Sequence, residues 1–176
     1  MNTTQVVDRH SSSPAPSVSG VHLRRTAEDD AARLTTMLAG LSPMSSYLRF
    51  LSGGSPSDRM VTRLLRRDST HGAWLAMAGD TAVGHVMWAL AEDAVEVGVV
   101  VSDAWQHRGI GRWLIQSALA EAAVAGAVAV RLDVHAENGR VIGMLRRSMP
   151  DATVTREAET LTYRAPMRSA TVPSCT

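Results

Sequence analysis

The residues best suited to chemistry lie in one stretch, residues 102–114, which follows a valine-rich segment and precedes a predicted helix. It contains, in order, Gln106, His107, Arg108, Gly109, Ile110, Gly111 and Arg112. Glycine lets the backbone approach a ligand closely, and the first turn of a helix has unpaired N–H groups and about half a positive charge. With two arginines beside them, these groups predict a cradle for an anion such as a pyrophosphate.

Two familiar phosphate-binding loops do not fit this stretch. The Walker loop requires a lysine, and the chain contains none, because all 18 of its Lys and Arg residues are arginine. The dinucleotide-binding fingerprint requires a third glycine, and Leu114 stands at that position. The spacing therefore indicates another kind of phosphate loop.

A second candidate for chemistry is Glu96, which lies ten residues before Gln106 inside the valine-rich segment. Because side chains alternate along a strand, Glu96 is expected to share one face with Gly98, Val100 and Ser102. Burying a carboxylate among valines is costly unless it has a partner or a function. The alternative, an exposed glutamate at the start of the strand, stays open.

The elements that must position these residues are predicted from hydrophobic period and turn residues. Strands are expected at 21–25, 74–78, 81–91, 94–102, 128–135, 153–156 and 160–164, and helices at about 26–39, within 41–54, from 55, at 109–125 and at 138–148. Thr26 with Asp29 predicts a capping box for the first helix, and Ser55 predicts an N-cap for the third. The order indicates a mixed α/β (α+β) domain with a crossover between the fourth and fifth strands.

Composition limits the partners. The formal net charge is +1, whereas nucleic-acid binders need a positive excess to release counterions from phosphates. No apolar run reaches the ~18 residues that a membrane span needs. Cys175 is the only cysteine, which excludes an intrachain disulfide, and the histidines show no metal-ligand spacing. We therefore expect a cytoplasmic protein without nucleic-acid, membrane or metal partners.

The domain organisation is expected to be simple. The Ser-, Thr- and Pro-rich residues 1–19 and the similar residues 169–176 predict flexible tails. Between them, residues 20–168 contain no internal repeat or low-complexity linker, and their length is that of one domain.

The sequence QHRGIG resembles the Q/R-x-x-G-x-G/A motif of the GNAT superfamily of acyl-CoA N-acyltransferases, and the resemblance extends over most of residues 20–166. It implies the GNAT fold: a central, mixed, mostly antiparallel and twisted sheet of six to seven strands, with helices on both faces and a splay at strands 4 and 5. It also implies acetyl-CoA as cosubstrate. Residues 106–112 would hold its pyrophosphate, and Val99, Val100 and Val101 would pair with its pantetheine arm.

The same resemblance gives Glu96 a role, because a glutamate on this strand often acts as general base in the family. An amine with lysine's pKa of ~10.4 is almost fully protonated at pH 7, so deprotonating it costs roughly 4–5 kcal/mol. A carboxylate can accept that proton, directly or through water.

The family's third marker is an asparagine after the fifth strand, and Asn138 stands there. Two roles are open for it: a contact to coenzyme A or a helix N-cap. The family often has a tyrosine seven residues later, the general acid for the departing thiolate, but here the residue is Leu145. Either the thiolate leaves unassisted or another donor serves, for which Ser148 is a weak candidate.

Residues 41–54 resemble the LSPxSxYxRF segment of bacterial protein lysine acetyltransferases of the Pat type, which commonly acetylate acyl-CoA synthetases. The residues that carry the resemblance are Ser42, Pro43, Ser45, Tyr47, Arg49 and Phe50. It implies substrate-side roles for Ser42, Tyr47, Arg49 and Phe50. Equally open is a structural role, in which Tyr47 and Phe50 cover the core and Arg49 is solvated.

The leading hypothesis is an acetyl-CoA-dependent N-acetyltransferase, a monomer or homodimer, that modifies a protein lysine by direct attack of the amine. Backbone N–H groups of the central strand would polarise the thioester carbonyl. A second hypothesis replaces the protein by a small amine such as a polyamine, an amino acid or an antibiotic. A third, of another class, is an acyl-CoA-binding sensor without turnover.

Overall fold

The computed structural model describes residues 18–50 and 56–167 of the chain. Its strands are β1 (His22–Arg25), β2 (His71–Ala78), β3 (Thr81–Ala91), β4 (Ala94–Val101), β5 (Ala129–His135), β6 (Thr153–Glu157) and β7 (Thr160–Pro166). Its α-helices are α1 (Ala31–Ala39), α2 (Pro43–Phe50), α3 (Asp58–Leu64), α4 (Ile110–Val124) and α5 (Gly139–Ser148), with short 3-10 turns η1 (Glu28–Asp30) and η2 (Asp103–Trp105). The strands expected from the sequence are all present. Most of the two predicted tails, and the predicted N-cap Ser55, lie outside the described residues.

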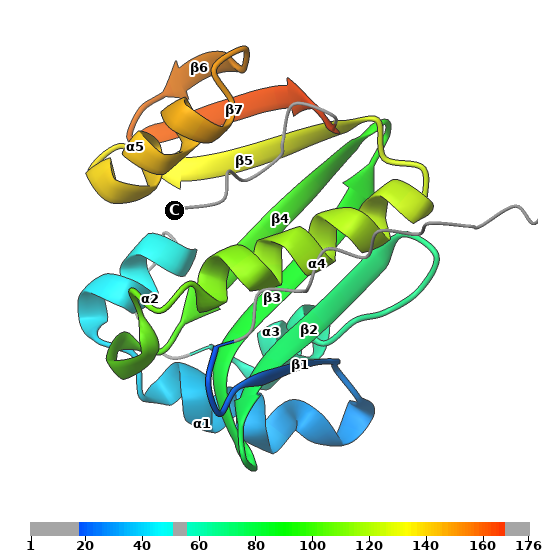
Figure 1. Cartoon of the computed structure of the whole chain (residues 1–176), viewed down its shortest axis with the longest axis vertical. Helices are drawn as coiled ribbons and strands as arrows, with labels where there is room; N and C mark the ends of the chain where they lie inside the picture. The colour runs from blue at the N-terminus through cyan, green and yellow to red at the C-terminus, as the bar shows by residue number, and fades with distance from the viewer. Residues whose placement is uncertain (1–17, 51–55, 168–176) are drawn as a thin grey trace, which may run out of the picture.

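The strands form one sheet in the order β1-β2-β3-β4-β5-β7-β6, in which every neighbouring pair is antiparallel except β4 and β5. These two parallel strands pair over three positions only, the last of which joins Glu96 to Arg131. Beyond it, β4 stays paired with β3 as far as Val101, and β5 stays paired with β7 as far as His135. Figure 1 shows the resulting wedge, which opens toward α2 and the first turn of α4. The predicted splay at strands 4 and 5 is confirmed.

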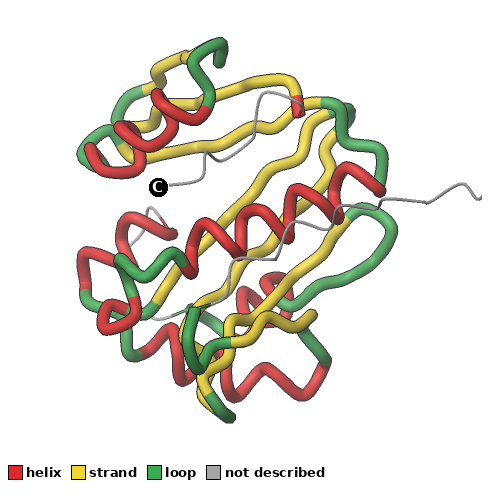
Figure 2. The backbone as a smooth tube through the Cα atoms, viewed as in Figure 1, coloured by secondary structure: helices red, strands yellow, loops and turns green. Residues whose placement is uncertain are grey.

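Helices cover both faces of the sheet. On one face α4 crosses the middle strands, as Figure 2 shows, and places a buried stripe against them: Ile110, Leu114, Ala118 and Ala122. This four-residue spacing keeps the stripe on one side of the helix, and its small alanines let the helix approach the strands closely. On the other face Leu34 of α1 and Leu64 of α3 pack against Leu75 and Val100 in a second, smaller core.

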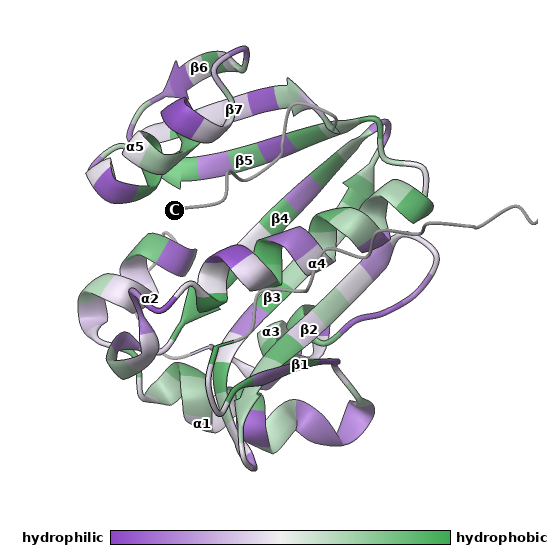
Figure 3. Ribbon diagram, in the orientation of Figure 1, coloured by the Kyte–Doolittle hydropathy of each residue, from purple (hydrophilic) through white to green (hydrophobic). Residues whose placement is uncertain are grey.

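The hydropathy of the residues follows these layers. Figure 3 colours much of β2, β3 and α4 hydrophobic or neutral, whereas β6 and its turn into β7 are largely hydrophilic. All residues of β6 are exposed. The half of the sheet formed by β5, β7 and β6 is therefore open to solvent on the face away from α4 and α5.

The start of the first helix differs from the sequence expectation. Asp30, not Asp29, provides the cap: its Oδ2 accepts a hydrogen bond from the backbone N–H of Ala27 at 2.7 Å. Thr26 is buried instead, and its hydroxyl lies 3.3 Å from the main-chain oxygen of Ala73 on β2. The expected Thr26–Asp29 capping box was wrong because a contact 47 residues away in the chain engages the threonine.

The start of α3 also differs. Its N-cap is Ser57, whose Oγ accepts a hydrogen bond from the N–H of Met60 at 3.3 Å. The sequence pattern placed the cap two residues earlier, at Ser55. Both serines are suitable cap residues, so the pattern alone does not discriminate between them.

A polar contact anchors α4 to the sheet. The Oε2 atom of Glu121 accepts hydrogen bonds from the indole Nε1 atoms of Trp74, at 2.8 Å, and Trp88, at 2.9 Å. The other oxygen pairs with Arg25 at 2.8 Å. Gly72 provides the space, because a Cβ there would overlap the indole of Trp88 and lie 2.6 Å from Glu121 Oε2. One carboxylate thus joins α4 to β1, β2 and β3.

Candidate active site

A cleft of about 590 Å³ occupies the open end of the wedge. Its walls come from the end of β4, the loop between β4 and α4, the first turns of α4 and α5, and one side of α2. Its lining residues are Met44, Ser45, Leu48, Arg49, Val99, Val100, Val101, Trp105, Gln106, His107, Gly109, Ile110, Gly111, Arg112, Ile115, Glu137, Asn138, Gly139, Arg140, Val141 and Met144. All predicted cofactor-binding residues except Arg108 therefore line one cleft.

The backbone at the start of α4 is arranged to accept an anion. Gly109 is the N-cap with φ +83°, a conformation that favours glycine, and it provides no side-chain cap for the helix. The N–H groups of the first turn are therefore available to a ligand. His107 also has a positive φ, +64°, which is uncommon for a residue with a side chain and occurs often at functional loops.

The cations of the cleft differ in part from those expected. Arg112 lines the cleft as predicted. Arg108 turns away: its Cζ lies 4.7 Å from the ring centroid of Trp105, and its Nη2 donates to a main-chain oxygen at 3.0 Å. Arg140 lines the cleft and lies 2.7 Å from His107 Nε2. Arg140 was not predicted from the sequence. A cation in the first turn of a helix is unfavourable because it opposes the helix dipole, so its presence there could have indicated an anion-binding role.

The start of α2 is hydrogen-bonded to the phosphate loop. Asp103 accepts hydrogen bonds from the backbone N–H and hydroxyl of Ser42, both at 2.9 Å, and from the hydroxyl of Ser45 at 2.6 Å. Gln106 completes the link, since its Nε2 donates to Ser45 Oγ at 3.2 Å and to the main-chain oxygen of Val101 at 3.1 Å. Ser42, expected on the substrate side, therefore contacts the loop. These bonds lower the pKa of Asp103, with Ser45 the largest cause.

Replacing Asp103 with alanine is expected to weaken acetyl-CoA binding about fivefold, because a freed loop must be ordered on binding at a cost of about 1 kcal/mol. Calorimetry against the wild-type chain measures this change. Asp151→Ala, in an exposed turn, is the matched control and should bind normally.

The hydrogen bonds of Asp103 should also depend on pH. Because the pKa of Asp103 is lowered, they are fully formed at pH values above the ordinary carboxyl pKa and are lost only as pH falls through the lowered value. Unchanged affinity in Asp103→Ala would show that the loop needs no anchor.

Glu96 lies outside the cleft. Its side chain is 47% exposed, and its Oε1 lies 3.4 Å from Arg131 Nη1. It lines a groove of about 400 Å³ on the open face of the sheet, on the same face of β4 as Gly98. The alternation predicted for the strand agrees with this position. Of the two readings left open by the sequence, the exposure agrees with the alternative of an exposed glutamate, and burial among valines was wrong. The small core under α1 and α3 includes Val100 and does not extend to Glu96.

The phenol of Tyr47 joins α2 to the far strand of the wedge. Its oxygen lies 3.1 Å from His135 Nε2, and the two rings meet edge to face with centroids 5.0 Å apart. The same nitrogen lies 3.2 Å from Glu159 Oε2, and the backbone N–H of Glu137 donates to His135 Nδ1 at 3.3 Å. Tyr47 thus links α2 to the end of β5 across the wedge.

The remaining residues of the LSPMSSYLRF segment divide between core and cleft. Phe50 packs against the small core of the α1 and α3 face. Arg49 lines the cleft and lies over Gly98 of β4. The alternative in which Arg49 is solvated was wrong, because its Nε and Nη2 atoms are buried.

Asn138 caps α5, and its Oδ1 accepts a hydrogen bond from the N–H of Val141 at 3.2 Å. The N-cap role left open by the sequence is therefore confirmed. Because Asn138 also lines the cleft, a contact to coenzyme A stays a prediction beside it.

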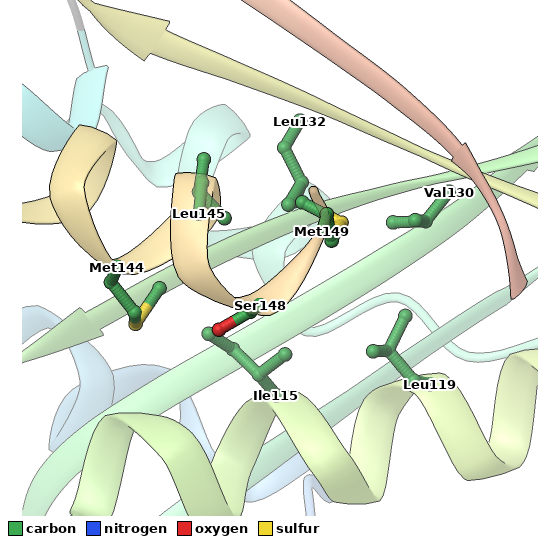
Figure 4. A pocket seen from close by; sticks show the side chains of 8 residues that line it. All are labelled: Ile115, Leu119, Val130, Leu132, Met144, Leu145, Ser148 and Met149. Carbon is green, nitrogen blue, oxygen red and sulfur yellow. The ribbon is translucent and has the colours of Figure 1, made fainter. Parts of the chain in front are cut away.

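Neither Leu145, which replaces the family's tyrosine, nor Ser148, the weak alternative donor, lies in the cleft. Figure 4 shows Leu145 and Ser148 in a small gap between α4 and α5, with the Ser148 hydroxyl among apolar side chains that include Ile115 and Leu119. The gap measures about 20 Å³. Ser148 is buried there, so its candidacy as a donor to the thiolate is not supported.

Two further searches of the described residues were negative. No group of three or more His, Cys, Asp or Glu residues in residues 18–50 and 56–167 is placed to hold a metal ion. Within the same residues, no helix has the length and apolarity needed to cross a membrane.

Comparisons with known proteins agree with this geometry. The model of the acetyltransferase (GNAT) family matches residues 44–149. A search of curated proteins gave no match. Among solved structures, the GNAT domain of S. lividans PAT superposes with a TM-score of 0.75 at 23% identity, over 83% of this chain and 90% of that one.

Two other similar structures contain the cosubstrate or its product. The yncA protein of Salmonella typhimurium, solved with acetyl-CoA, has a TM-score of 0.67 at 16% identity, over 89% of this chain and 99% of that one. The paia N-acetyltransferase of Thermoplasma acidophilum, solved with coenzyme A, has a TM-score of 0.61 at 15% identity, over 83% and 98%. At these identities the likeness shows the fold, and the family model shows the family. The chain therefore belongs to the GNAT acetyltransferase family, whose members are acetyl-CoA-dependent N-acetyltransferases.

Proposed function

We propose that this enzyme transfers the acetyl group of acetyl-CoA to a lysine side chain of a protein, such as an acyl-CoA synthetase, with Glu96 as general base. The observation that carries the proposal is the shape of the groove beside Glu96. The side chains of Asp93, Glu96, Arg131 and Arg164 in this groove are all about half exposed. A surface this shallow suits a protein segment better than a small molecule, which a concave pocket normally surrounds.

The charges of the groove support the same acceptor. Asp93 is paired with Arg164 at 2.8 Å, and Glu96 lies 3.4 Å from Arg131. These carboxylates are therefore already neutralised by neighbouring guanidinium groups. Glu92, which also lines the groove, has no ion pair in the described part of the chain, so one carboxylate remains for the cationic side chain of the acceptor. A site for a free polyamine would instead be expected to keep several unpaired carboxylates.

The cleft provides the groups needed for the cosubstrate. The first turn of α4, with Gly109 and Gly111, and the side chains of Arg112 and Arg140 would hold its phosphates. The edge of β4 beyond Glu96 is not paired with β5, so its backbone groups can bond to the amide-containing arm. Acetyl-CoA supplies the thioester that is attacked.

The position of Glu96 in the sheet supports the proposed role of general base. It lies at the point where β4 and β5 separate, since its pairing with Arg131 is the last between the two strands. Its exposure lets the carboxylate exchange the proton with solvent, directly or through water. If Glu96 accepts the proton, its removal should slow transfer at least tenfold, because a positioned general base contributes about a hundredfold or more.

The acceptor is tested by incubating the enzyme and acetyl-CoA with purified acyl-CoA synthetases and with a panel of polyamines, amino acids and aminoglycosides. The expected result is acetyl-lysine on at least one synthetase. The chain contains no lysine, so a tag-free enzyme gives no acetyl-lysine signal of its own. Transfer to a small amine with none to any synthetase would replace the proposal by the small-amine alternative.

The base is tested with Glu96→Gln, which should lower the rate of transfer and leave acetyl-CoA affinity unchanged. Glu28→Gln, exposed in the η1 turn and outside the groove, is the matched control and should transfer at the wild-type rate. An undiminished rate in Glu96→Gln would exclude Glu96 as the base.

A further inference from the structure

The head group of Arg49 is the least expected feature of the cleft. Its Nε and Nη2 atoms are buried and make no hydrogen bond, and it forms no ion pair with a carboxylate in the described part of the chain. Its Cζ lies 5.1 Å from the ring centroid of Phe50, a cation–π contact that compensates only part of the cost of burial. Burying a charge without an ionic partner costs several kcal/mol. A cation kept in such a place therefore calls for a function.

The backbone of β4 is shaped to admit this guanidinium. A Cβ built on Gly98 would lie 2.5 Å from Nη2 and 2.8 Å from Cζ of Arg49. Only a residue without a side chain leaves this room. Arg49 thus lies directly over the strand whose next residues, Val99 to Val101, line the cleft with it.

The titratable groups around Arg49 leave its charge uncompensated. His85 on β3 donates its Nε2 proton to the main-chain oxygen of Leu64 at 3.0 Å, which leaves Nδ1 unprotonated and without a partner. Burial, and then the Arg49 charge, lower the pKa of His85 to about 3, so it is neutral. Glu96, two residues from Gly98, is engaged by Arg131. Burial lowers the pKa of Arg49 itself to about 10, so the guanidinium stays charged at neutral pH.

Acetyl transfer creates negative charge that needs such a cation. The amine nitrogen forms a bond to the thioester carbon, and the carbonyl π pair moves to oxygen. When the carbonyl re-forms, the C–S bond breaks and its pair goes to sulfur, while the amine proton passes to the general base. A proton-donating side chain would neutralise the sulfur, but Leu145 and Ser148 of α5 lie in the apolar gap of Figure 4.

We propose that Arg49 supplies the positive charge that stabilises the departing coenzyme A thiolate, in place of a proton-donating side chain. A cation that is already beside the developing charge stabilises it with little reorganisation during the reaction. The inference rests on the proposed function only in that coenzyme A must bind in this cleft. It does not depend on which amine is the acceptor.

The test measures the thiol of bound coenzyme A and needs no acceptor. Thiolate ultraviolet absorbance is recorded for saturated complexes from pH 6 to 9.5, after subtraction of complexes with an analogue in which hydrogen replaces the thiol. An ordinary thiol has a pKa near 8.5. In the wild-type complex we expect about tenfold more thiolate than for free coenzyme A at pH 7, and in Arg49→Met we expect no excess.

Two further variants keep the test decisive. Arg49→Lys retains the charge and should retain part of the excess thiolate. Gly98→Ala should displace the guanidinium without removing it, because the new Cβ meets the flexible end of Arg49, and should lose the excess. Arg63→Met, on the exposed side of α3, is the control. Arg49→Met is expected to fold, since removing an uncompensated buried charge is often neutral or stabilising.

The outcomes separate this inference from the proposed function. If coenzyme A and acetyl-CoA do not bind at all, the proposed function fails. If they bind and the excess thiolate is the same in wild type, Arg49→Met and Gly98→Ala, the role of Arg49 alone is overturned. In transfer assays Arg49→Met should lower kcat with little change in the KM for acetyl-CoA.

Discussion

Replacing Gly111 with tryptophan is expected to abolish acetyl-CoA binding, with a loss of about a thousandfold in affinity, or about 4 kcal/mol. Gly111 lies in the first turn of α4 and lines the cleft beside Val101 of β4. An indole there would fill the space in front of the N–H groups that are expected to hold the pyrophosphate. Titration calorimetry with acetyl-CoA measures the change directly.

Gly111→Ala is the matched control for this experiment. A Cβ at Gly111 would lie 3.5 Å from Val101 Cγ2, which is an ordinary contact, so alanine should bind within a few fold of wild type. Circular dichroism and the melting temperature verify that both variants are folded. Near-native affinity in a folded Gly111→Trp would mean that the phosphates bind elsewhere.

Replacing Glu121 with alanine is expected to lower the free energy of unfolding by about 3 kcal/mol, because each buried donor that loses its acceptor costs about 1–3 kcal/mol. The substitution removes the acceptor of two indole N–H groups, those of Trp74 and Trp88. For a chain of this length the melting temperature should fall by roughly 10 °C. Urea unfolding, followed by tryptophan fluorescence, provides the measurement.

Glu121→Gln separates the hydrogen bonds from the charge. It keeps one carbonyl oxygen as acceptor, so it should cost about 1 kcal/mol. The Arg25 ion pair is half exposed on the arginine side and is expected to contribute little. Equal stability of Glu121→Ala and wild type would mean that the two indoles find other partners.

Much of the fold could be predicted because local patterns and tertiary packing agree. The strand at Thr81–Ala91 has the predicted bounds, since turn residues delimit it on both sides. The predictions failed where a contact with a residue far away in the sequence determined the local structure. Thr26 looks like a helix cap in sequence, but its hydroxyl contacts Ala73 on another strand.

The site could be predicted where backbone geometry decides it. The glycines of the phosphate loop lie in the cleft as predicted, because a turn that leads into a helix can adopt few backbone conformations. Side-chain directions were less predictable: Arg108 stacks on Trp105, and Arg140 from another element takes a place in the cleft. The alternation of side chains along β4 predicted on which face of the sheet Glu96 lies. It could not predict whether helices cover that face, because this depends on where α1, α2 and α3 end.

The short pairing of β4 with β5 gives this sheet two interior edges in addition to its outer ones. An exposed edge normally invites a strand from another chain. Here α2 and the first turn of α4 flank the opening (Figure 1). The amide-containing arm of the cosubstrate is proposed to pair with the β4 edge. If it does, each bound cosubstrate molecule extends the sheet and also stabilises the native state by mass action.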